Sequence, residues 1–311
     1  MKDSLHKPVL YKEIIHALQP GSSGRYIDGT VGAGGHARGV LEACAPDGRL
    51  LGLDIDPQAL ALARETLAPY GKRAILAQAS YASLPDVMQD IGWEAVDGIV
   101  LDLGVSSMQL DTPARGFSFQ YEAPLDMRFN PGTGQSAADL LNTIDEHQLA
   151  QILFKYGEEP RARRIAKMII GERPILTTTQ LAQIVKRAYP GYSRMHPATR
   201  TFQALRIAVN DEFTTLEKGL QSAVRALRPG GRLAVISFHS LEDRTVKEFF
   251  RRESRDQLNP PHEPIFKVER RATLKVINKK PITPSAEEIE GNQRARSAKL
   301  RVAEKLSKSS K

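Results

Sequence analysis

Short apolar runs alternate with helix-like patterns along the first hundred residues of the chain. Apolar residues repeated every three or four positions predict a helix, and a short apolar run bounded by turn residues predicts a buried strand. These rules predict helices over 35–45 and 57–67, and strands over 25–28, 49–54, 73–78 and 96–102. Repeated alternation of strand and helix is typical of a doubly wound, mostly parallel α/β sheet.

The alternation stops after the fourth predicted strand. Residues 106–130 are rich in Gly, Pro, Asp and Phe, which predicts an irregular loop, and residues 136–227 show helical periodicity with little strand signal. The strand pattern returns at 232–237. We therefore expect one discontinuous domain and one insert. The expected bounds are 1–110 with 228–311 for the α/β domain, and 111–227 for an irregular loop plus a helical insert domain.

The last part of the chain continues the sheet pattern. Ser240 and Asp243 have the spacing of a capping box, which predicts the start of a helix. Two short apolar runs, 273–277 and 298–303, predict an antiparallel hairpin at the edge of the sheet.

Composition limits the setting in which the protein works. Hydrophobic residues make up 41% of the 311 positions, enough for a sizeable core. No stretch reaches the roughly 20 apolar residues that a membrane span needs, and the first residues lack the apolar region of a signal peptide. The one cysteine, Cys44, has no partner for an internal disulfide. We expect a cytoplasmic protein with no membrane partner.

The net charge of +8 is concentrated in two segments. Residues 155–206 hold eleven Lys and Arg against three Asp and Glu, and residues 267–311 hold thirteen against five. Basic segments on an otherwise acidic body favour a polyanionic partner such as a nucleic acid. The alternative is a pair of solvated basic faces with no partner.

A glycine-rich turn follows the first predicted strand, in the sequence Asp28-Gly-Thr-Val-Gly-Ala-Gly-Gly-His36. Glycines let a ligand approach the backbone, and the helix after the turn offers unpaired N–H groups. Asp54 ends the next strand twenty residues after Gly34, where a carboxylate can accept hydrogen bonds from both hydroxyls of a ribose. A helix cap is the alternative role, but Asp56 fits it better because it directly precedes Pro57.

Spacing alone does not separate a dinucleotide from S-adenosylmethionine, because the turn also satisfies the loose dinucleotide pattern. Three features favour S-adenosylmethionine. Asp28 precedes the glycines, where methyltransferases often place an acid near the methionine amine. The sequence Leu227-Arg-Pro-Gly-Gly-Arg-Leu233 is a common lead-in to the last parallel strand of class I methyltransferases. Asp102-Leu-Gly104 places an acid and a flexible turn at the end of the fourth strand.

Six sequence strings carry a family resemblance. They are Tyr26-Ile-Asp-Gly-Thr-Val-Gly-Ala-Gly-Gly-His36, Leu101-Asp-Leu-Gly-Val-Ser-Ser107, Arg115-Gly-Phe-Ser-Phe119, Pro124-Leu-Asp-Met-Arg128, His196-Pro-Ala-Thr-Arg-Thr-Phe-Gln203 and Ser237-Phe-His-Ser-Leu-Glu-Asp-Arg244. The chain closely resembles the bacterial ribosomal RNA small subunit methyltransferase H family, also called MraW. The resemblance covers about residues 6–252 and returns weakly at 292–300.

The resemblance implies a class I methyltransferase that uses S-adenosylmethionine to methylate the N4 amine of one cytidine in the decoding region of 16S ribosomal RNA. It implies a cofactor site made of Gly34, Gly35, His36, Asp54, Tyr81, Asp102 and Gln109. Tyr81 would lie against the adenine, although we expect Phe at this position in the family. Packing in the core is the alternative role for Tyr81.

The sequence leaves amine activation open. Amino-methylating DNA enzymes usually carry an acidic or polar residue followed by Pro-Pro and an aromatic residue after strand four, whereas this chain has Asp102-Leu-Gly-Val105. Asp102 is our candidate to accept a hydrogen bond from the amine, and a pure cofactor contact is its alternative role. We identify no other catalytic residue.

The expected RNA-binding residues lie in the helical insert. Lys and Arg side chains neutralise phosphates, and we expect Arg161, Arg163, Arg164, Arg194, His196, Arg200 and Arg206 to contact RNA. Phe117 and Phe119 are candidates either for base stacking or for packing of the loop, and packing is the favoured role.

Two other functions fit parts of the pattern. An NAD-dependent dehydrogenase would explain the glycine-rich turn but not the charge, and a non-catalytic RNA-binding ribosome-assembly factor would explain the charge but not the intact cofactor site. We expect no metal, since the seven histidines do not cluster with other ligands. The expected partner is small-subunit ribosomal RNA or the 30S subunit, and the oligomeric state is left open.

Overall fold

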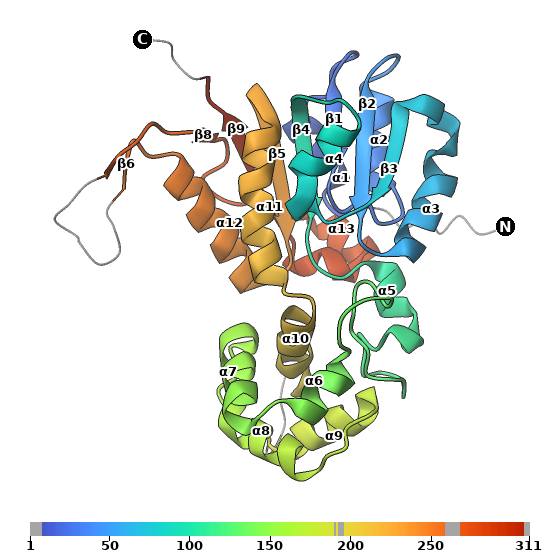
Figure 1. Cartoon of the computed structure of the whole chain (residues 1–311), viewed down its shortest axis with the longest axis vertical. Helices are drawn as coiled ribbons and strands as arrows, with labels where there is room; N and C mark the ends of the chain where they lie inside the picture. Colours follow the sequence, from blue (N-terminus) through green and yellow to red (C-terminus); the bar gives the residue numbers. More distant parts are fainter. Residues whose placement is uncertain (1–7, 190, 192–195, 259–267, 308–311) are drawn as a thin grey trace. The chain divides into compact units, whose positions relative to one another are not determined.

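The computed structural model describes residues 8–189, 191, 196–258 and 268–307 (Figure 1). The chain divides into two compact units. Unit 1 comprises Met1–Gly104 and Thr215–Lys311, and unit 2 comprises Val105–Thr214.

Unit 1 is built on a seven-stranded sheet with the order β3-β2-β1-β4-β5-β9-β8. The first five of these strands run parallel, whereas β9 is antiparallel to both β5 and β8. This order confirms the expected Rossmann-like, class I methyltransferase fold, including the edge hairpin. The strands are β1 (Arg25–Asp28), β2 (Arg49–Asp54), β3 (Ala74–Gln78), β4 (Val96–Asp102), β5 (Leu227–Ser237), β8 (Leu274–Val276) and β9 (Lys299–Lys305).

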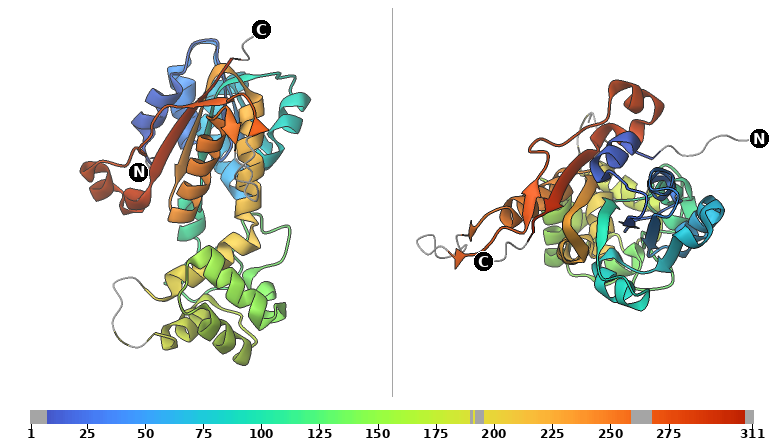
Figure 2. Two further views of the ribbon diagram at one scale, coloured as in Figure 1. Left: turned by 90° about the vertical axis from the view of Figure 1, so that its left-hand side faces the viewer. Right: turned by 90° about the horizontal axis from the view of Figure 1, so that it is seen from above.

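Helices cover both faces of this sheet (Figure 2). Residues of α1 (Tyr11–Leu18), α2 (Gly35–Ala43) and α3 (Pro57–Leu67) build the core on one face, where Ala295 of the short η4 (Gln293–Ser297) joins them. Residues of α4 (Leu84–Asp90), α11 (Glu212–Ala226) and α12 (Ser240–Glu253) build the core on the other face. Unit 1 also contains η1 (Ala68–Arg73), η2 (Tyr81–Ser83), α13 (Ala286–Gly291) and the β6 (Gln257–Leu258)–β7 (Val268–Glu269) pair.

Unit 2 is helical and has its own hydrophobic core. Its elements are α5 (Ser107–Asp111), η3 (Pro113–Arg115), α6 (Ala137–Thr143), α7 (Glu146–Gly157), α8 (Ala162–Gly171), α9 (Thr178–Arg187) and α10 (Ala198–Val209). The stretch 106–130 is less irregular than expected, because Ser106 and Gln109 form a capping box that starts α5.

The bounds of the two units differ from the domain bounds expected from the sequence. The first bound moves back to residue 104 because Val105 and Leu110 pack against the core of unit 2. The second moves back to 214 because Leu216, Leu220 and Ala223 of α11 pack in the core of unit 1. Helical periodicity marks an element but does not tell which core the element joins.

Two caps illustrate what the sequence reveals locally. Asp56 caps α3 as predicted, since its side chain accepts a hydrogen bond from Gln58 N at 3.0 Å. The predicted capping box at Ser240 and Asp243 is wrong by one residue, because His239 and Glu242 form it. Asp243 instead pairs with two cations of β9.

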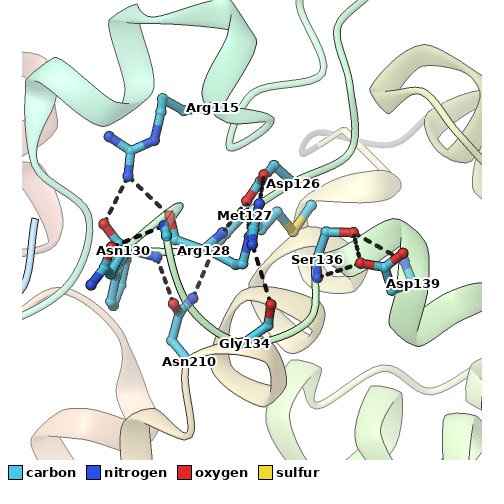
Figure 3. Close-up of polar contacts among 11 residues, drawn as sticks. Arg115, Asp126, Met127, Arg128, Asn130, Gly134, Ser136, Asp139 and Asn210 are labelled. Atoms are coloured by element: carbon cyan, nitrogen blue, oxygen red, sulfur yellow. Dashed lines mark hydrogen bonds and ion pairs between the residues drawn. The ribbon is translucent and has the colours of Figure 1, made fainter.

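Polar side chains hold the loop around Met127 in unit 2 (Figure 3). Buried Arg115 donates a hydrogen bond to the carbonyl oxygen of Arg128 at 2.9 Å. Asn210 donates to the carbonyl oxygen of Met127 at 2.8 Å, where Met127 adopts a φ of +63°. The Arg128 guanidinium pairs with Asp126 at 2.7 Å. These contacts satisfy a backbone that forms neither helix nor strand.

Within the described ranges, no helix combines the length and apolar character needed to cross a bilayer.

A polar cluster ties α12 to the segment that leads into β8. Burial alone would raise the pKa of Glu253, but hydrogen bonds from Arg270 and Thr273 outweigh it and lower the pKa to about 2. A carboxylate with a lowered pKa stabilises the fold fully above its ordinary value of 4.5 and loses this contribution as the pH falls toward 2.

We therefore expect Glu253→Gln to make the unfolding free energy depend less steeply on pH in the acid range. Between pH 6 and pH 3 the wild-type chain should lose more unfolding free energy than the variant, by up to about 2 kcal/mol. Urea unfolding at each pH measures this difference. Parallel profiles for the two proteins would contradict the assigned ion-pair cluster.

Candidate cofactor and active site

Three neighbouring parallel strands of unit 1 each end on an aspartate. Asp28 ends β1, Asp54 ends β2 and Asp102 ends β4. Asp28 is in register with Gly52 of β2 and Val100 of β4, so the three carboxyl groups share one edge of the sheet. Ligands of doubly wound sheets bind at this carboxyl edge.

The glycine-rich turn connects β1 to α2 at the same edge. Gly32 and Gly34 have φ values of +52° and +88°, a conformation that glycine adopts without strain. Gly34 is the N-cap of α2 and carries no side chain, so the first N–H groups of α2 are not covered from this position. A Cβ atom at Gly34 would also press on Leu67 at 3.3 Å.

Asp54 is held at the edge by two backbone groups. Its oxygens accept hydrogen bonds from Gly32 N and Asp56 N, each at 2.9 Å. Burial raises the pKa of Asp54, although these N–H groups act in the opposite direction. The side chain remains partly exposed, and each carboxylate oxygen can accept a further hydrogen bond.

His36, Asp28 and Asp102 form a charged group beside the turn. His36 Nε2 lies 3.6 Å from Asp102 Oδ2, and the His36 side chain is 5% exposed. Burial opposes protonation of His36, but Asp102 and Asp28 outweigh it and raise the pKa of the ring. Burial raises the pKa of Asp28 to about 7, with Asp102 and Asp54 adding to the rise while His36 and the Thr30 N–H oppose it.

Several buried polar atoms of this group lack a hydrogen-bond partner within the described residues. They are Nδ1 and Nε2 of His36 and Oδ1 of Asp102. Buried polar atoms are normally paired, so the site has donors and acceptors for a polar ligand. A histidine and acids next to an open glycine turn fit the amino-acid end of S-adenosylmethionine, and Asp54 fits its ribose.

The sequence did not single out Thr30. Its Oγ1 accepts a hydrogen bond from Asp102 N at 2.7 Å and so ties the turn to the end of β4. The only signal available was its place inside the glycine-rich string. Gly104 follows with a φ of +91° and turns the chain away from β4.

Three predicted cofactor residues remain: Gly35 is the first residue of α2, and Tyr81 and Gln109 have clear structural roles. The ring of Tyr81 lies against α11 at Gly219, where an added Cβ atom would come within 2.2 Å of it. Tyr81 is also partly buried against the core of unit 1. Gln109 belongs to unit 2, where its side chain accepts from Ser106 N at 3.0 Å. Cofactor contacts of Tyr81 and Gln109 stay predictions.

Some of the residues predicted to bind RNA are exposed, whereas others already contact groups within unit 2. Arg163 and Arg164 are exposed on α8. Arg161 instead packs 4.5 Å from the Tyr189 ring and donates to a backbone oxygen. Arg206 pairs through two hydrogen bonds with Glu212, at 2.7 and 2.8 Å. Salt-bridged or packed guanidinium groups are less available to phosphates.

The remaining candidates surround the start of α10. His196 is exposed, its ring stacks on Phe119 at 4.5 Å, and burial together with Lys186 lowers its pKa. Arg200 is partly buried, and Arg194 lies outside the described residues.

Both candidate stacking aromatics are packed within unit 2. Phe117 is buried and stacks on Phe129 at 5.7 Å, while Phe119 also meets Phe202 edge-on at 4.9 Å. The packing role that we favoured is confirmed for these two rings. In contrast, Tyr121 in the same loop is 63% exposed, and no sequence pattern singled it out.

Among the described residues, no three His, Cys, Asp or Glu side chains are grouped so as to hold a metal ion.

We expect Asp28→Asn to stabilise the protein more as the pH rises. A carboxyl group whose pKa is raised from 3.8 to about 7 makes the folded state less stable as the pH increases between these values. The variant lacks this penalty, so its advantage in unfolding free energy should grow from pH 4 to pH 7 in urea titrations. In calorimetry at pH 8, above the pKa of Asp28, the variant should also bind S-adenosylmethionine at least about tenfold more weakly, because it lacks the charge of the ionised carboxylate. An advantage that is constant with pH would contradict the buried, proton-holding Asp28.

Comparison with known proteins agrees with this site. The profile of the MraW methylase family matches residues 3–306. The ribosomal RNA small subunit methyltransferase H of Geotalea uraniireducens (strain Rf4) is 52% identical over 312 residues, which cover 98% of this chain and 100% of that protein. The enzyme of the same name from Thermomicrobium roseum is 52% identical over 305 residues, covering 97% and 94%.

These matches span nearly the whole chain and leave the dehydrogenase alternative without support. The resemblance found in the sequence is confirmed, and the chain belongs to the MraW methylase family.

Proposed function

We propose that this chain methylates small-subunit ribosomal RNA with S-adenosylmethionine, at the N4 amine of one cytidine in the decoding region. The observation that carries the proposal is the edge of unit 1 that brings together Asp28, Asp54, Asp102 and the glycine-rich turn. Buried polar atoms of His36 and Asp102 have no hydrogen-bond partner there among the described residues. Family membership supplies the reaction class, and the names of the relatives supply the substrate. We expect the methylation reaction to take place in the cytoplasm, because ribosomal subunits are its proposed substrate.

The proposed cofactor contacts follow from the geometry. Asp54 would accept hydrogen bonds from the ribose hydroxyls, because it lies at the carboxyl end of β2 and two N–H groups fix the orientation of its carboxylate. Asp28, His36 and Asp102 would bind the charged amino-acid end. When bound, S-adenosylmethionine supplies a methyl group attached to a positively charged sulfur.

The chain itself contributes position and charge. The lone pair of a cytosine amine is delocalised into the ring, so the amine must be held close to the methyl group and in line with it. Asp102 is our candidate to accept a hydrogen bond from the amine as positive charge develops on its nitrogen. No covalent nucleophile is required. Cys44 is buried, and burial raises the pKa of its thiol, which keeps it unreactive.

Unit 2 is the proposed RNA-recognition part of the chain. The exposed Arg163 and Arg164 of α8, together with Lys167 one turn later, offer three positive charges on one helix face. Such a face binds phosphates without reading the base sequence. We leave Arg161 and Arg206 out of this surface because both guanidinium groups have partners within the unit.

The function is tested by mapping methylated nucleotides. Purified chain, labelled S-adenosylmethionine and small subunits from cells that lack the chain should yield one new N4-methylcytidine, located by mass spectrometry. Asp54→Asn should reduce cofactor affinity by at least about tenfold in calorimetry, since the amide donates where the carboxylate accepts. Asp56→Asn is the matched control, because asparagine caps a helix as well as aspartate does. Cofactor binding without any methylated nucleotide would favour a non-catalytic assembly factor.

Reversal of two charges on α8 tests the RNA surface. The double variant Arg163→Glu and Arg164→Glu should bind subunits at least about tenfold more weakly at low salt and lower the slope of log affinity against log salt by about 2. The matched control replaces both residues by lysine and should keep the wild-type slope. Equal slopes for all three proteins would show that α8 is only a solvated face.

A further inference from the structure

The charge that helix α12 exposes cannot be recognised from the sequence alone. Residues 240–255 contain five Lys and Arg against four Asp and Glu. A count of net charge along the chain therefore shows this segment as nearly neutral. The folded structure separates the two signs.

Three of the four acidic side chains form hydrogen bonds or ion pairs with other groups of unit 1. Glu242 is buried and accepts hydrogen bonds from the backbone at the start of the helix, including Phe238 N at 2.8 Å. Asp243 pairs with Arg301 at 2.6 Å and with a lysine of the same strand at 3.3 Å. Glu253 pairs with Arg270. Glu248 is the one acid of this segment that is exposed.

Three cations of α12 lie on the side of the helix opposite to the paired acids, and a fourth follows the end of the helix. Arg244, Lys247, Arg251 and Arg255 are all exposed, and we call these four residues the α12 stripe. The spacing of Arg244, Lys247 and Arg251 places them along one face of α12, which also contains Glu248. Arg255 follows two residues after Glu253, the last residue of the helix. The face toward the sheet is apolar and contains Val246, Phe249 and Phe250.

The α12 stripe starts at the edge that carries the candidate active site. Helix α12 follows β5, and β5 pairs in parallel with β4, with Ile236 in register with Asp102. Gly104, just beyond β4, lies near Phe238, which immediately precedes the cap of α12. The stripe therefore begins beside the end of β4 and runs away from it along the exposed side of α12, the helix that lies beside α11 and below β8 in Figure 1.

We propose that the α12 stripe binds the phosphate backbone of the RNA substrate beside the target nucleotide. This inference rests on the proposed function and adds an RNA-binding surface in unit 1 to the one on α8. A helix face that is merely solvated usually mixes both signs of charge, whereas four cations here face solvent with one acid. Phosphate contacts of this kind fix the position of the nucleic acid and leave the reading of bases to other groups.

The test is the triple variant Lys247→Gln, Arg251→Gln and Arg255→Gln. The matched control removes three exposed cations from the other end of unit 1, with Arg49→Gln, Arg64→Gln and Lys72→Gln. Arg49 starts β2, Lys72 precedes β3, and Arg64 lies late in α3, toward the amino edge of the sheet. The probes are small ribosomal subunits from cells that lack the chain, and the protein-free ribosomal RNA of these subunits.

The α12 variant should bind both probes at least about tenfold more weakly at low salt, with a salt slope lowered by about 2 to 3. Its KM for subunits should rise while kcat at saturating subunit concentration and the calorimetric affinity for S-adenosylmethionine stay unchanged. The control variant should stay within about twofold of wild type in every measurement, since distant surface charges are largely screened.

Each contrary outcome has a separate meaning. Equal binding by the two triple variants overturns the α12 proposal and leaves the proposed function intact. Weaker binding to whole subunits with unchanged binding to protein-free RNA shows a ribosomal protein as the partner, which also overturns it. A wild-type chain that leaves the subunits unmethylated refutes the proposed function itself.

Discussion

The burial of carboxyl groups at one edge of the sheet, with further acids nearby, is the constraint on which the site depends. Parallel pairing of β1 with β2 and β4 forces Asp28, Asp54 and Asp102 to that edge. The chain tolerates this because burial raises the pKa of Asp28 to about 7, which lets the side chain keep a proton up to near neutral pH, and because a buried histidine lies beside Asp102. Stability is thus lower than an apolar edge would allow, and a ligand that carries positive charge recovers part of it. The same groups that weaken the empty fold select the ligand.

Much of this arrangement was predictable from the sequence, for a local reason. Strands β1, β2 and β4 have the expected bounds, because each is a short apolar run that ends on an aspartate. The roles of side chains whose partners are distant in sequence were harder to predict. Asp243 was assigned to a cap three residues from Ser240, yet it pairs with Arg301, which no local pattern indicates. Spacing reveals neighbours on one element, whereas pairing between elements depends on the sheet order.

The same limit applies to charged side chains, because the sequence does not reveal which of them pair inside the fold, and this affects the prediction of function. Arg161 and Arg206 were chosen because they lie in a basic segment, but the fold gives both guanidinium groups partners inside unit 2. Helix α12 was passed over because its acids balance its cations in the sequence. What a polyanion meets is the charge that remains outside after internal pairing, and only the three-dimensional structure determines that remainder.

The interrupted sheet also affects how the protein is made on the ribosome. Strand β4 can complete its pairing only with β5, and all of unit 2 is synthesised between them. Strands β1 to β4 therefore leave the exit tunnel with an unpaired edge, while the helical insert already has a complete core of its own. We expect the insert to fold first and the methyl-donor site last, so that the nascent chain cannot act on RNA before nearly all of it has been translated.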